Sequence, residues 1–209
     1  LDTQTALFRA QSYLLDPAWQ NPWPADPVTR LQPLAVKTSG EKILEEVHQL
    51  PSEQHLLDHK GLSVYFGYQN QMPNTVNEIA RLREMVFREH NEGSGEPLDT
   101  DHFDATYTHL FVMKQDTGQI IGAYRMGQTD KLLADGNLEN LYLHRMFDFG
   151  PDFVNRQQPC LELGRSFLIP EYQRSFQGLF LLWRGIGAFV CQHPQYRTLY
   201  GTVSISKLY

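Results

Sequence analysis

Three stretches of the chain place apolar side chains at the spacing of an α-helix. Residues 41–50 form a short amphipathic stripe, and residues 75–88 form a longer one that Asn74 or Thr75 can cap. The third stretch, residues 176–190, is apolar almost throughout. These patterns predict three helices of different polarity.

Between and after these helices, β-branched and aromatic residues gather in short runs that are typical of strands. The runs cover residues 62–68, 109–115, 119–126, 160–169 and 197–206. The second and third runs are joined by a short glycine-containing turn, which indicates a hairpin. The order strand, helix, hairpin, strand, helix, strand predicts an α/β (α+β) fold, in which helices pack on a mixed sheet.

The N-terminal part of the chain shows no such regularity. Residues 16–38 carry five of the 12 prolines and no sustained period, as in a linker or an extended arm. We therefore expect residues 1–60 to form an N-terminal arm or linker with one short helix, and residues 61–209 to form the folded domain. Because the chain lacks a starting Met and stops just after a strand-like run, we expect it to be a fragment, truncated at its C-terminus.

Composition and charge exclude several classes of protein. A length of 209 residues with 41% hydrophobic residues allows one domain with a sizeable core. A net charge of −6 without a basic stripe argues against a nucleic-acid partner. Cys160 and Cys191 lie far apart without a C-x-x-C motif, so we expect no disulfide and no metal site. Residues 179–191, the longest apolar stretch, are too few to span a bilayer. A cytoplasmic protein fits these features best.

Three acidic residues lie close together in the loop after the second predicted helix. Asp99, Asp101 and Asp104 do not form a calcium-binding EF-hand, because an EF-hand starting at Asp99 would require glycine at 104. Three carboxylates at this spacing repel one another unless a cation, an arginine or an ammonium group lies among them. From spacing alone, a solvated loop whose acids cap turns remains the alternative.

Six runs of sequence carry a recognisable pattern in a fixed order. They are R-L-R-E-M-V-F-R-E-H (81–90), L-D-T-D-H-F-D (98–104), H-L-F-V (109–112), I-I-G-A-Y-R-M (120–126), L-E-L-G-R-S-F-L-I-P-E-Y-Q-R (161–174) and L-L-W-R-G-I-G (181–187). Together these runs resemble the acyl-transferring branch of the GNAT superfamily. This branch contains ornithine-type N-acyltransferases that make aminolipids and proteins labelled hemolysins, and it is distantly similar to acyl-homoserine-lactone synthases. Residues 41–84 also resemble the connector of larger members, which carry a lysophospholipid acyltransferase domain ahead of this one.

The resemblance implies a GNAT fold, with a mixed, mostly antiparallel central sheet and helices on both faces. It implies an N-acyltransferase that moves a long-chain fatty acyl group from acyl carrier protein, or from acyl-CoA, to the amine of an amino acid such as ornithine, in aminolipid biosynthesis. No permanently bound cofactor is expected, and a lipid product implies peripheral contact with the inner face of the membrane. Two alternatives stay open: a short-chain acetyltransferase that uses acetyl-CoA, and a non-catalytic docking or regulatory module.

Glu162 is the candidate general base. It lies between Leu161 and Leu163 in a predicted strand, where burial raises the pKa of a carboxyl toward a useful range, and E-L-G-R matches the E-x-x-R of the lactone synthases at Glu162 and Arg165. Strict alternation puts the two on opposite strand faces, and a bulge at Gly164 would bring them together. The pattern also allows a solvent-facing glutamate.

By the same resemblance, five residues order the acceptor pocket: Arg83, Phe87, Asp101, Asp104 and Arg125. We expect the two aspartates to hold an arginine or the substrate ammonium, and an arginine to hold the substrate carboxylate through two parallel hydrogen bonds. The alternative for each arginine is a surface salt bridge of little consequence. His109 and His144 are acid or base candidates by chemistry alone, without a recognisable partner.

The donor site is expected where GNAT enzymes cradle a pyrophosphate on a Q/R-x-x-G-x-G/A turn that opens a helix. Here Arg174 is followed at the third place by Gln177, and Gly178 comes one residue later, so the turn departs from the coenzyme A pattern. This departure favours acyl carrier protein as the donor, and Ser204 on the last strand is a further donor contact. Without an activated Ser or Cys, we expect direct transfer without an acyl-enzyme.

Overall fold

The computed structural model of the protein describes residues 31–90, 92–149, 158–174 and 176–202, and the chain from Gln32 onward forms one compact unit. Residues 1–30 of the predicted arm and the predicted donor contact Ser204 lie outside the described residues.

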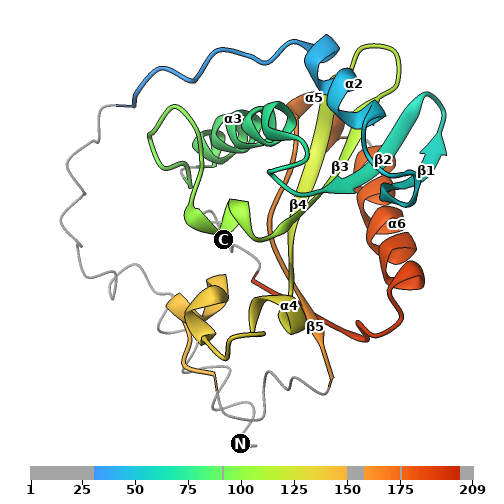
Figure 1. The fold of residues 1–209 in the computed structure, drawn as a ribbon. Coiled ribbons are helices and arrows are strands. Elements are labelled where there is room, and N and C mark those ends of the chain that lie inside the picture. The colour runs from blue at the N-terminus through green and yellow to red at the C-terminus, as the bar shows by residue number, and fades with distance from the viewer. Residues whose placement is uncertain (1–30, 91, 150–157, 175, 203–209) are drawn as a thin grey trace, which may run out of the picture. The chain divides into compact units, whose positions relative to one another are not determined.

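Six strands form one sheet, and they lie in the order in which they follow along the chain (Figure 1). Neighbouring strands are antiparallel, except that the last two are parallel. The predicted mixed, mostly antiparallel sheet with helices on both faces is thus confirmed. The strands are β1 (His55–His59), β2 (Leu62–Gly67), β3 (Thr108–Lys114), β4 (Ile120–Gln128), β5 (Cys160–Leu168) and β6 (Thr198–Gly201).

Helices cover both faces of this sheet, as Figure 1 shows. The helices α2 (Gly40–His48) and α3 (Pro73–Glu89) cover one face, and α6 (Phe176–Gln192) covers the other. Two short helices, α4 (Thr129–Leu132) and α5 (Pro170–Gln173), follow β4 and β5. Short 3₁₀ turns connect these elements at Ser52–Gln54, His102–Ala105, Leu138–Asn140 and Tyr142–Arg145.

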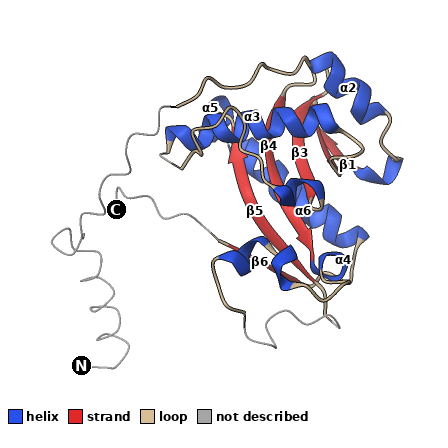
Figure 2. Ribbon diagram, turned by 60° about the vertical axis from the view of Figure 1, so that its left-hand side comes forward, coloured by secondary structure: helices blue, strands red, loops and turns tan. Residues whose placement is uncertain are grey.

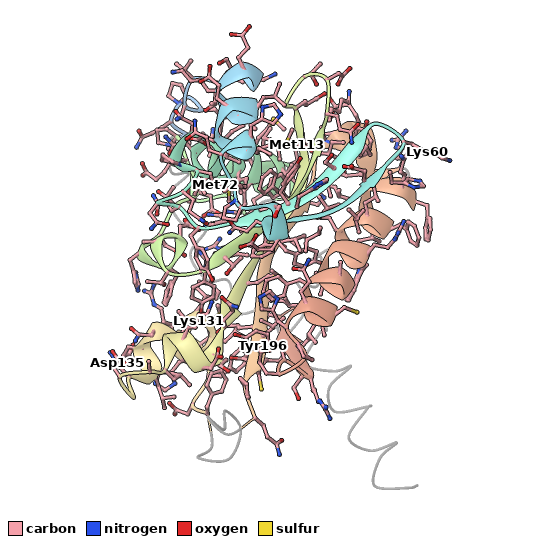
Figure 3. All side chains as sticks on the ribbon, turned by 45° about the vertical axis from the view of Figure 1, so that its right-hand side comes forward. Lys60, Met72, Met113, Lys131, Asp135 and Tyr196 are labelled. Atoms are coloured by element: carbon pink, nitrogen blue, oxygen red, sulfur yellow. The ribbon has the colours of Figure 1, made fainter. Side chains whose placement is uncertain are left out.

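The alternation of strand side chains divides the hydrophobic core into two layers. On β3, Phe111 and Met113 pack against α2 and α3, whereas Leu110 and Val112 pack against α6. Met72 and Met113, labelled in Figure 3, belong to the α2–α3 layer. Tyr196, labelled in the same figure, belongs to the α6 layer, and its hydroxyl donates to Asp130 of α4 at 2.7 Å.

Residues 40–59, which we had assigned to the N-terminal arm, contribute to the folded domain. Ile43 and Val47 of α2 are buried in the core, and β1 pairs with β2 as the edge strand of the sheet. The sheet therefore begins at His55, before the predicted boundary at residue 60. The polar sequence His55–His59 gives little strand signal, because β1 is an edge strand whose side chains stay half exposed.

The start of α3 also differs from the prediction. The helix begins at Pro73 after Met72, so neither Asn74 nor Thr75 is its cap. Instead the Glu46 carboxylate of α2 accepts hydrogen bonds from the backbone N–H groups of Asn74 and Thr75, both at 2.8 Å. A side chain distant in sequence thus satisfies donors that the local sequence leaves free.

Candidate active site

Glu162 lies in the middle of β5, and its carboxylate is buried and hydrogen-bonded. Only 2% of the residue is exposed. Oε1 accepts a hydrogen bond from the backbone N–H of Leu143 at 2.9 Å, and Oε2 accepts from the hydroxyls of Tyr107 at 3.1 Å and Tyr200 at 3.4 Å. A carboxylate oxygen has two lone pairs, so Oε1 keeps one for a further proton donor.

Burial raises the pKa of Glu162 above the ordinary value of a glutamate, because the ionised form loses its hydration. The hydrogen bonds from Leu143 and Tyr107 and the positive charge of Arg125 counteract part of this increase. The two tyrosine hydroxyls stay protonated beside the carboxylate, since burial and the charge of Glu162 both raise their pKa. The site therefore holds one carboxyl group whose basicity is increased, next to groups that only donate to it.

A bulge in β5 brings Arg165 onto the same face of the sheet as Glu162. Arg125 of β4 pairs with Gly164, but Ala123 pairs with Phe167, so Arg165 and Ser166 both lie opposite a single residue of β4. Arg165 adopts a left-handed backbone conformation, with φ of 51°. The sequence predicts the bulge at Gly164, and the structure places it one residue later, at Arg165. Its effect is the predicted one, because Arg165 reaches aspartates on the α3 side.

Strain at Arg165 marks this position as unusual. A non-glycine residue in the left-handed region costs of order 1 kcal/mol and persists only where its surroundings hold it. Here the Nη1 atom of Arg165 donates to Asp99 at 3.1 Å, and its guanidinium lies 5.2 Å from the centre of the Tyr142 ring. Nη2 of Arg165 also lies 3.6 Å from Asp101 Oδ2, so three contacts fix a side chain that keeps 23% of its surface exposed.

Three arginines and three aspartates form a buried network beside Glu162, which we call the arginine–aspartate cluster. Arg83 Nε donates to Asp99 Oδ2 at 2.6 Å, and Arg83 Nη2 donates to Asp104 at 3.1 Å. Arg125 Nη1 donates to Asp101 Oδ1 at 2.5 Å and to Asp104 Oδ1 at 3.0 Å. The six members are Arg83, Arg125, Arg165, Asp99, Asp101 and Asp104.

The aspartates of this cluster also shape the loop that carries them. Asp101 accepts from the backbone N–H of Phe103, and Asp104 accepts from that of Asp101, so the two form a capping box on the turn His102–Ala105. Burial alone would raise the pKa of Asp104, but Arg83 and Arg125 hold it at about 2. Both sequence interpretations are thus partly correct: the acids cap a turn, and arginines lie among them.

His109 of β3 contacts the arginine–aspartate cluster at Asp104. Its Nε2 lies 2.9 Å from the backbone oxygen of Asp104, and burial lowers its pKa to about 4. The ring is therefore neutral at neutral pH and holds the Asp104 turn by one hydrogen bond. The sequence did not reveal this partner, because it is a backbone atom of a turn.

Two guanidinium donors in this region have no partner among the described residues. They are Nη2 of Arg125 and Nε of Arg165, both of which are shielded from solvent. Arg125 lies 5.0 to 5.7 Å from the ring centres of Tyr142, Tyr107 and Phe103, which stabilise its charge without using its hydrogens. Buried donors without acceptors are costly, so they identify a place where an anionic ligand group would be favourable.

Gly164 leaves space beside these donors. It pairs with Arg125, so the two positions face the same side of the sheet, and a Cβ atom on Gly164 would meet no described atom within 4 Å. The arrangement can therefore combine three functions on one face: a basic carboxylate, cationic donors for an anion, and room between them.

Comparison with known proteins identifies the domain. Residues 82–184 match the family described as "Acetyltransferase (GNAT) domain". The domain has a GNAT-like fold. Two relatives are named glycine N(alpha)-acyltransferase: that of Bacteroides thetaiotaomicron is 33% identical over 70% of this chain and 47% of its own length, and that of Phocaeicola vulgatus is 34% identical over 66% and 45%. The chain thus spans about half the length of these curated relatives.

Among solved structures, the AHL synthase LasI matches with a TM-score of 0.49 and 19% identity, over 68% of this chain and 72% of its own. Both Glu162 and the arginine–aspartate cluster lie within the segment that matches the GNAT family.

Two of the predicted acceptor-pocket residues come from α3. Arg83 is 1% exposed and is bound to Asp99 and Asp104, and its pairing with Asp104 is one that we expected for the aspartates. Phe87 packs against the core between α3 and the sheet. The roles of both residues in ordering an acceptor pocket stay predictions.

The predicted donor residues lie around the start of α6. Arg174 is exposed at the end of α5, Gln177 is half-buried in the first turn of α6, and Gly178 packs closely against Leu168 and Tyr172. In Figure 2, β6 lies beside the first part of β5 only, and the far end of β5 leads into α5. The pairing of the two strands ends at Leu163 and Gly201 within the described residues, so β5 continues beyond it toward Arg174.

Two hollows elsewhere on the GNAT domain do not touch Glu162 or the cluster. One of 290 Å³ lies between α3 and the β3–β4 turn, and one of 170 Å³ lies beside His55 and Asp58. Their linings mix charged and apolar groups and contain neither the basic carboxylate nor the two unpaired guanidinium donors.

Sequence reasoning missed the tyrosines that complete the site. Tyr107 lies directly before β3, Tyr142 lies in a 3₁₀ turn, and Tyr200 lies on the short strand β6. Gly127, opposite Glu162, provides the room for the Tyr107 ring, because a Cβ atom there would approach that ring to 2.6 Å. A glycine facing a strand glutamate is the one local signal that could have indicated a large neighbour.

Proposed function

We propose that this GNAT domain catalyses N-acylation of an amino acid by a long-chain acyl thioester, with Glu162 as the general base. The observation that carries the proposal is the position of Glu162: a buried carboxyl with a raised pKa, on the same sheet face as two unpaired guanidinium donors. A structural carboxylate would instead be expected to pair with one of these arginines.

The reaction removes two protons from the acceptor nitrogen and gives one proton to the leaving thiolate. The acceptor arrives as an ammonium ion, whose nitrogen lone pair is occupied, and Glu162 Oε1 takes the first proton through its remaining lone pair and passes it to solvent. The free amine then attacks the thioester carbonyl and the C–N bond forms. The nitrogen loses its second proton as the C–S bond breaks, and this proton goes to the leaving thiolate. The products are an amide, a free thiol and one released proton, without an acyl-enzyme.

The acceptor in this proposal is an α-amino acid. Its carboxylate would pair with Arg165, which is the partly exposed arginine of the cluster, while its amine points along the open side of Gly164 toward Glu162. The names of the two relatives favour glycine as the first acceptor to test, with ornithine as the alternative that the motif resemblance suggests. A small acceptor also fits this site, because its free space is the space that a side chain at Gly164 would occupy.

For the donor, we propose a long-chain acyl group carried on acyl carrier protein or coenzyme A. Arg174, Gln177, Gly178 and Ser204 remain the predicted donor contacts, and the departure from the pyrophosphate-binding pattern favours acyl carrier protein. The product would be an N-acyl amino acid, which is an aminolipid.

Mass spectrometry of the products tests this function. The protein is incubated with palmitoyl-acyl carrier protein, palmitoyl-CoA or acetyl-CoA, each with glycine, ornithine and alanine. We expect a long-chain N-acyl amino acid and little N-acetyl product. Acetylation as the dominant reaction would favour a short-chain acetyltransferase, and the absence of product with every donor would favour a docking or regulatory module.

The role of Arg165 is tested by removing either side of the proposed ion pair. We expect Arg165→Gln to raise the KM for glycine at least about tenfold, which corresponds to one charge-assisted hydrogen bond. Glycinamide, which lacks the carboxylate, should be a poor substrate of the unchanged protein and should lose no further activity in Arg165→Gln. An equal loss with both acceptors would instead mean that Arg165 only holds the loop of Asp99 and Asp101.

A further inference from the structure

The outer face of α6 differs from the outer faces of the other helices. The exposed positions of α2 carry Glu41, Lys42 and Glu45, as expected for a helix that faces water. In contrast, the 17 residues of α6 include Arg184 as their one charged residue. The helix is apolar on its inner side, where Leu181, Leu182, Ile186 and Phe189 pack against the sheet, and also on its outer side.

Four large apolar side chains project from the first half of this outer face. They recur at helical spacing, so they form one continuous stripe. We call it the α6 stripe: Phe176 (78% exposed), Leu179 (44%), Phe180 (39%) and Trp183 (53%). Further along the same face, Gly187 and Cys191 are also exposed and add no charge. Within the described part of the chain, nothing covers the stripe. Its side chains form one patch, whereas apolar residues that are exposed singly are normal on a protein surface.

The segment of sequence that carries the α6 stripe is positively charged, although the whole chain has a net charge of −6. Residues 172–202 contain three arginines, and all 24 aspartates and glutamates of the chain lie outside this segment, with Glu171 exposed directly before it. Arg174 and Arg184 are exposed beside the stripe, and the Arg184 guanidinium lies 5.6 Å from the centre of the Phe180 ring. An apolar stripe flanked by two exposed arginines is complementary to an anionic surface.

We propose that the α6 stripe binds the surface of an anionic lipid bilayer, with the helix axis parallel to the membrane plane. Among the described helices, none is long and apolar enough to cross a membrane, so the contact is interfacial. Phenylalanine and tryptophan are residues that partition to the lipid headgroup region, and an arginine on the flank can extend to lipid phosphates. Aromatic residues and arginine are also enriched in protein–protein interfaces, so the test includes outcomes that would identify a protein partner.

This surface is independent of the proposed acceptor. Figure 1 shows α3 and α6 on opposite sides of the sheet. The stripe lies on the α6 side, whereas Glu162 and the arginine–aspartate cluster lie on the α3 side. Loss of membrane binding would therefore leave the chemistry at Glu162 in place.

Flotation with lipid vesicles tests the proposal. The 209-residue protein is mixed with vesicles of phosphatidylglycerol and phosphatidylethanolamine, or with neutral phosphatidylcholine vesicles. We expect binding to the anionic vesicles, a loss of at least about tenfold in the double variant Phe180→Ser, Trp183→Ser, and a loss of about fivefold in Arg184→Gln. Phe147→Ser is the matched control, because Phe147 is a 50% exposed phenylalanine outside α6 and should leave binding unchanged.

Fluorescence gives a second readout at the stripe itself. Tryptophan emission should shift to shorter wavelength when anionic vesicles are added, and this shift should be smaller in Trp183→Phe, which keeps Trp19 and Trp23. The proposal is overturned if no vesicles are bound, or if the double variant floats like the unchanged protein. It is also overturned if the double variant converts a dimer into a monomer, since a second copy would then cover the stripe. Finally, it is overturned if the double variant keeps vesicle binding but loses turnover with acyl carrier protein alone, because the stripe would then bind that protein.

Discussion

At the scale of single residues, the charges beside Glu162 fix the positions of two arginines and add little to the stability of the fold. Three arginines and three aspartates neutralise one another in the arginine–aspartate cluster. Removing six charges from water costs a desolvation energy that ion pairing only offsets, so well-packed apolar side chains would stabilise the fold as well. The cluster instead holds Arg125 and Arg165, with one unpaired donor each, at fixed positions on the face of Glu162.

His109 gives the folded protein a sensitivity to acid. Burial lowers its pKa to about 4, whereas an unfolded histidine titrates near 6.5, so between these values the unfolded chain binds a proton that the folded chain does not. We expect the free energy of unfolding to fall by about 3 kcal/mol as the pH falls from 6.5 to 4, and His109→Gln to remove most of this slope. Urea unfolding of both proteins at pH 7.0 and 5.0 measures this change in the free energy of unfolding.

The matched control for this prediction is His48→Gln, because His48 is exposed on α2 and should keep the slope. The contribution of Asp104 lies at lower pH. Its folded pKa of about 2 is below the ordinary 3.8, so its stabilisation is complete above pH 4 and is lost only in stronger acid. An unchanged slope between pH 7.0 and 5.0 in His109→Gln would contradict the account of this cluster.

At the scale of elements, α2 and α3 depend on each other through one carboxylate. Glu46 accepts four hydrogen bonds of 2.7 to 2.8 Å from Asn74 and Thr75, including both backbone N–H groups at the start of α3. Its negative charge also lies at the positive end of the helix. We expect Glu46→Ala to lower the free energy of unfolding by about 2 kcal/mol, measured by urea titration. The neighbouring variant Glu45→Ala, at an exposed position, should change it by less than about 0.5 kcal/mol.

Elements with strong periodicity could be predicted from the sequence. The helix over residues 75–88, the hairpin over 109–126 and the apolar helix after residue 175 all exist, with shifts of at most two residues at their ends. Edge strand β1 and the four short 3₁₀ turns of the described residues were not predicted, because each spans only three to five residues and shows no sustained hydrophobic period. The start of α3 was not predicted either, because Glu46, a residue distant in sequence, replaces the local cap that the sequence suggested.

The candidate site could be predicted in part, for the same physical reason. Burial of Glu162 follows from its apolar neighbours in a strand, and the need for a bulge follows from the period of two. The position of that bulge at Arg165 depends on the register of β5 against β4, which the local sequence does not encode. The tyrosines around Glu162 come from the end of a loop, a turn and a short strand, so no single stretch of sequence brings them together.

At the scale of the whole molecule, the two faces of the sheet have different chemistry. The α3 face carries the buried charges and Glu162, and the α6 face carries the α6 stripe with Arg174 and Arg184 beside it. A membrane-bound α6 face would leave the charged face directed away from the lipid, open to a water-soluble amino acid.

The central claim is that Glu162 acts as the general base, and the variant Glu162→Gln tests this role most directly. Turnover of a long-chain acyl donor with glycine is measured beside the free energy of unfolding at pH 7. We predict that the variant loses at least about 100-fold in kcat, the scale of a lost general base. Its stability should not fall, because the neutral amide avoids the desolvation that raises the pKa of Glu162. Full turnover in Glu162→Gln would contradict the mechanism, and a large loss of stability together with activity would show that Glu162 serves the fold.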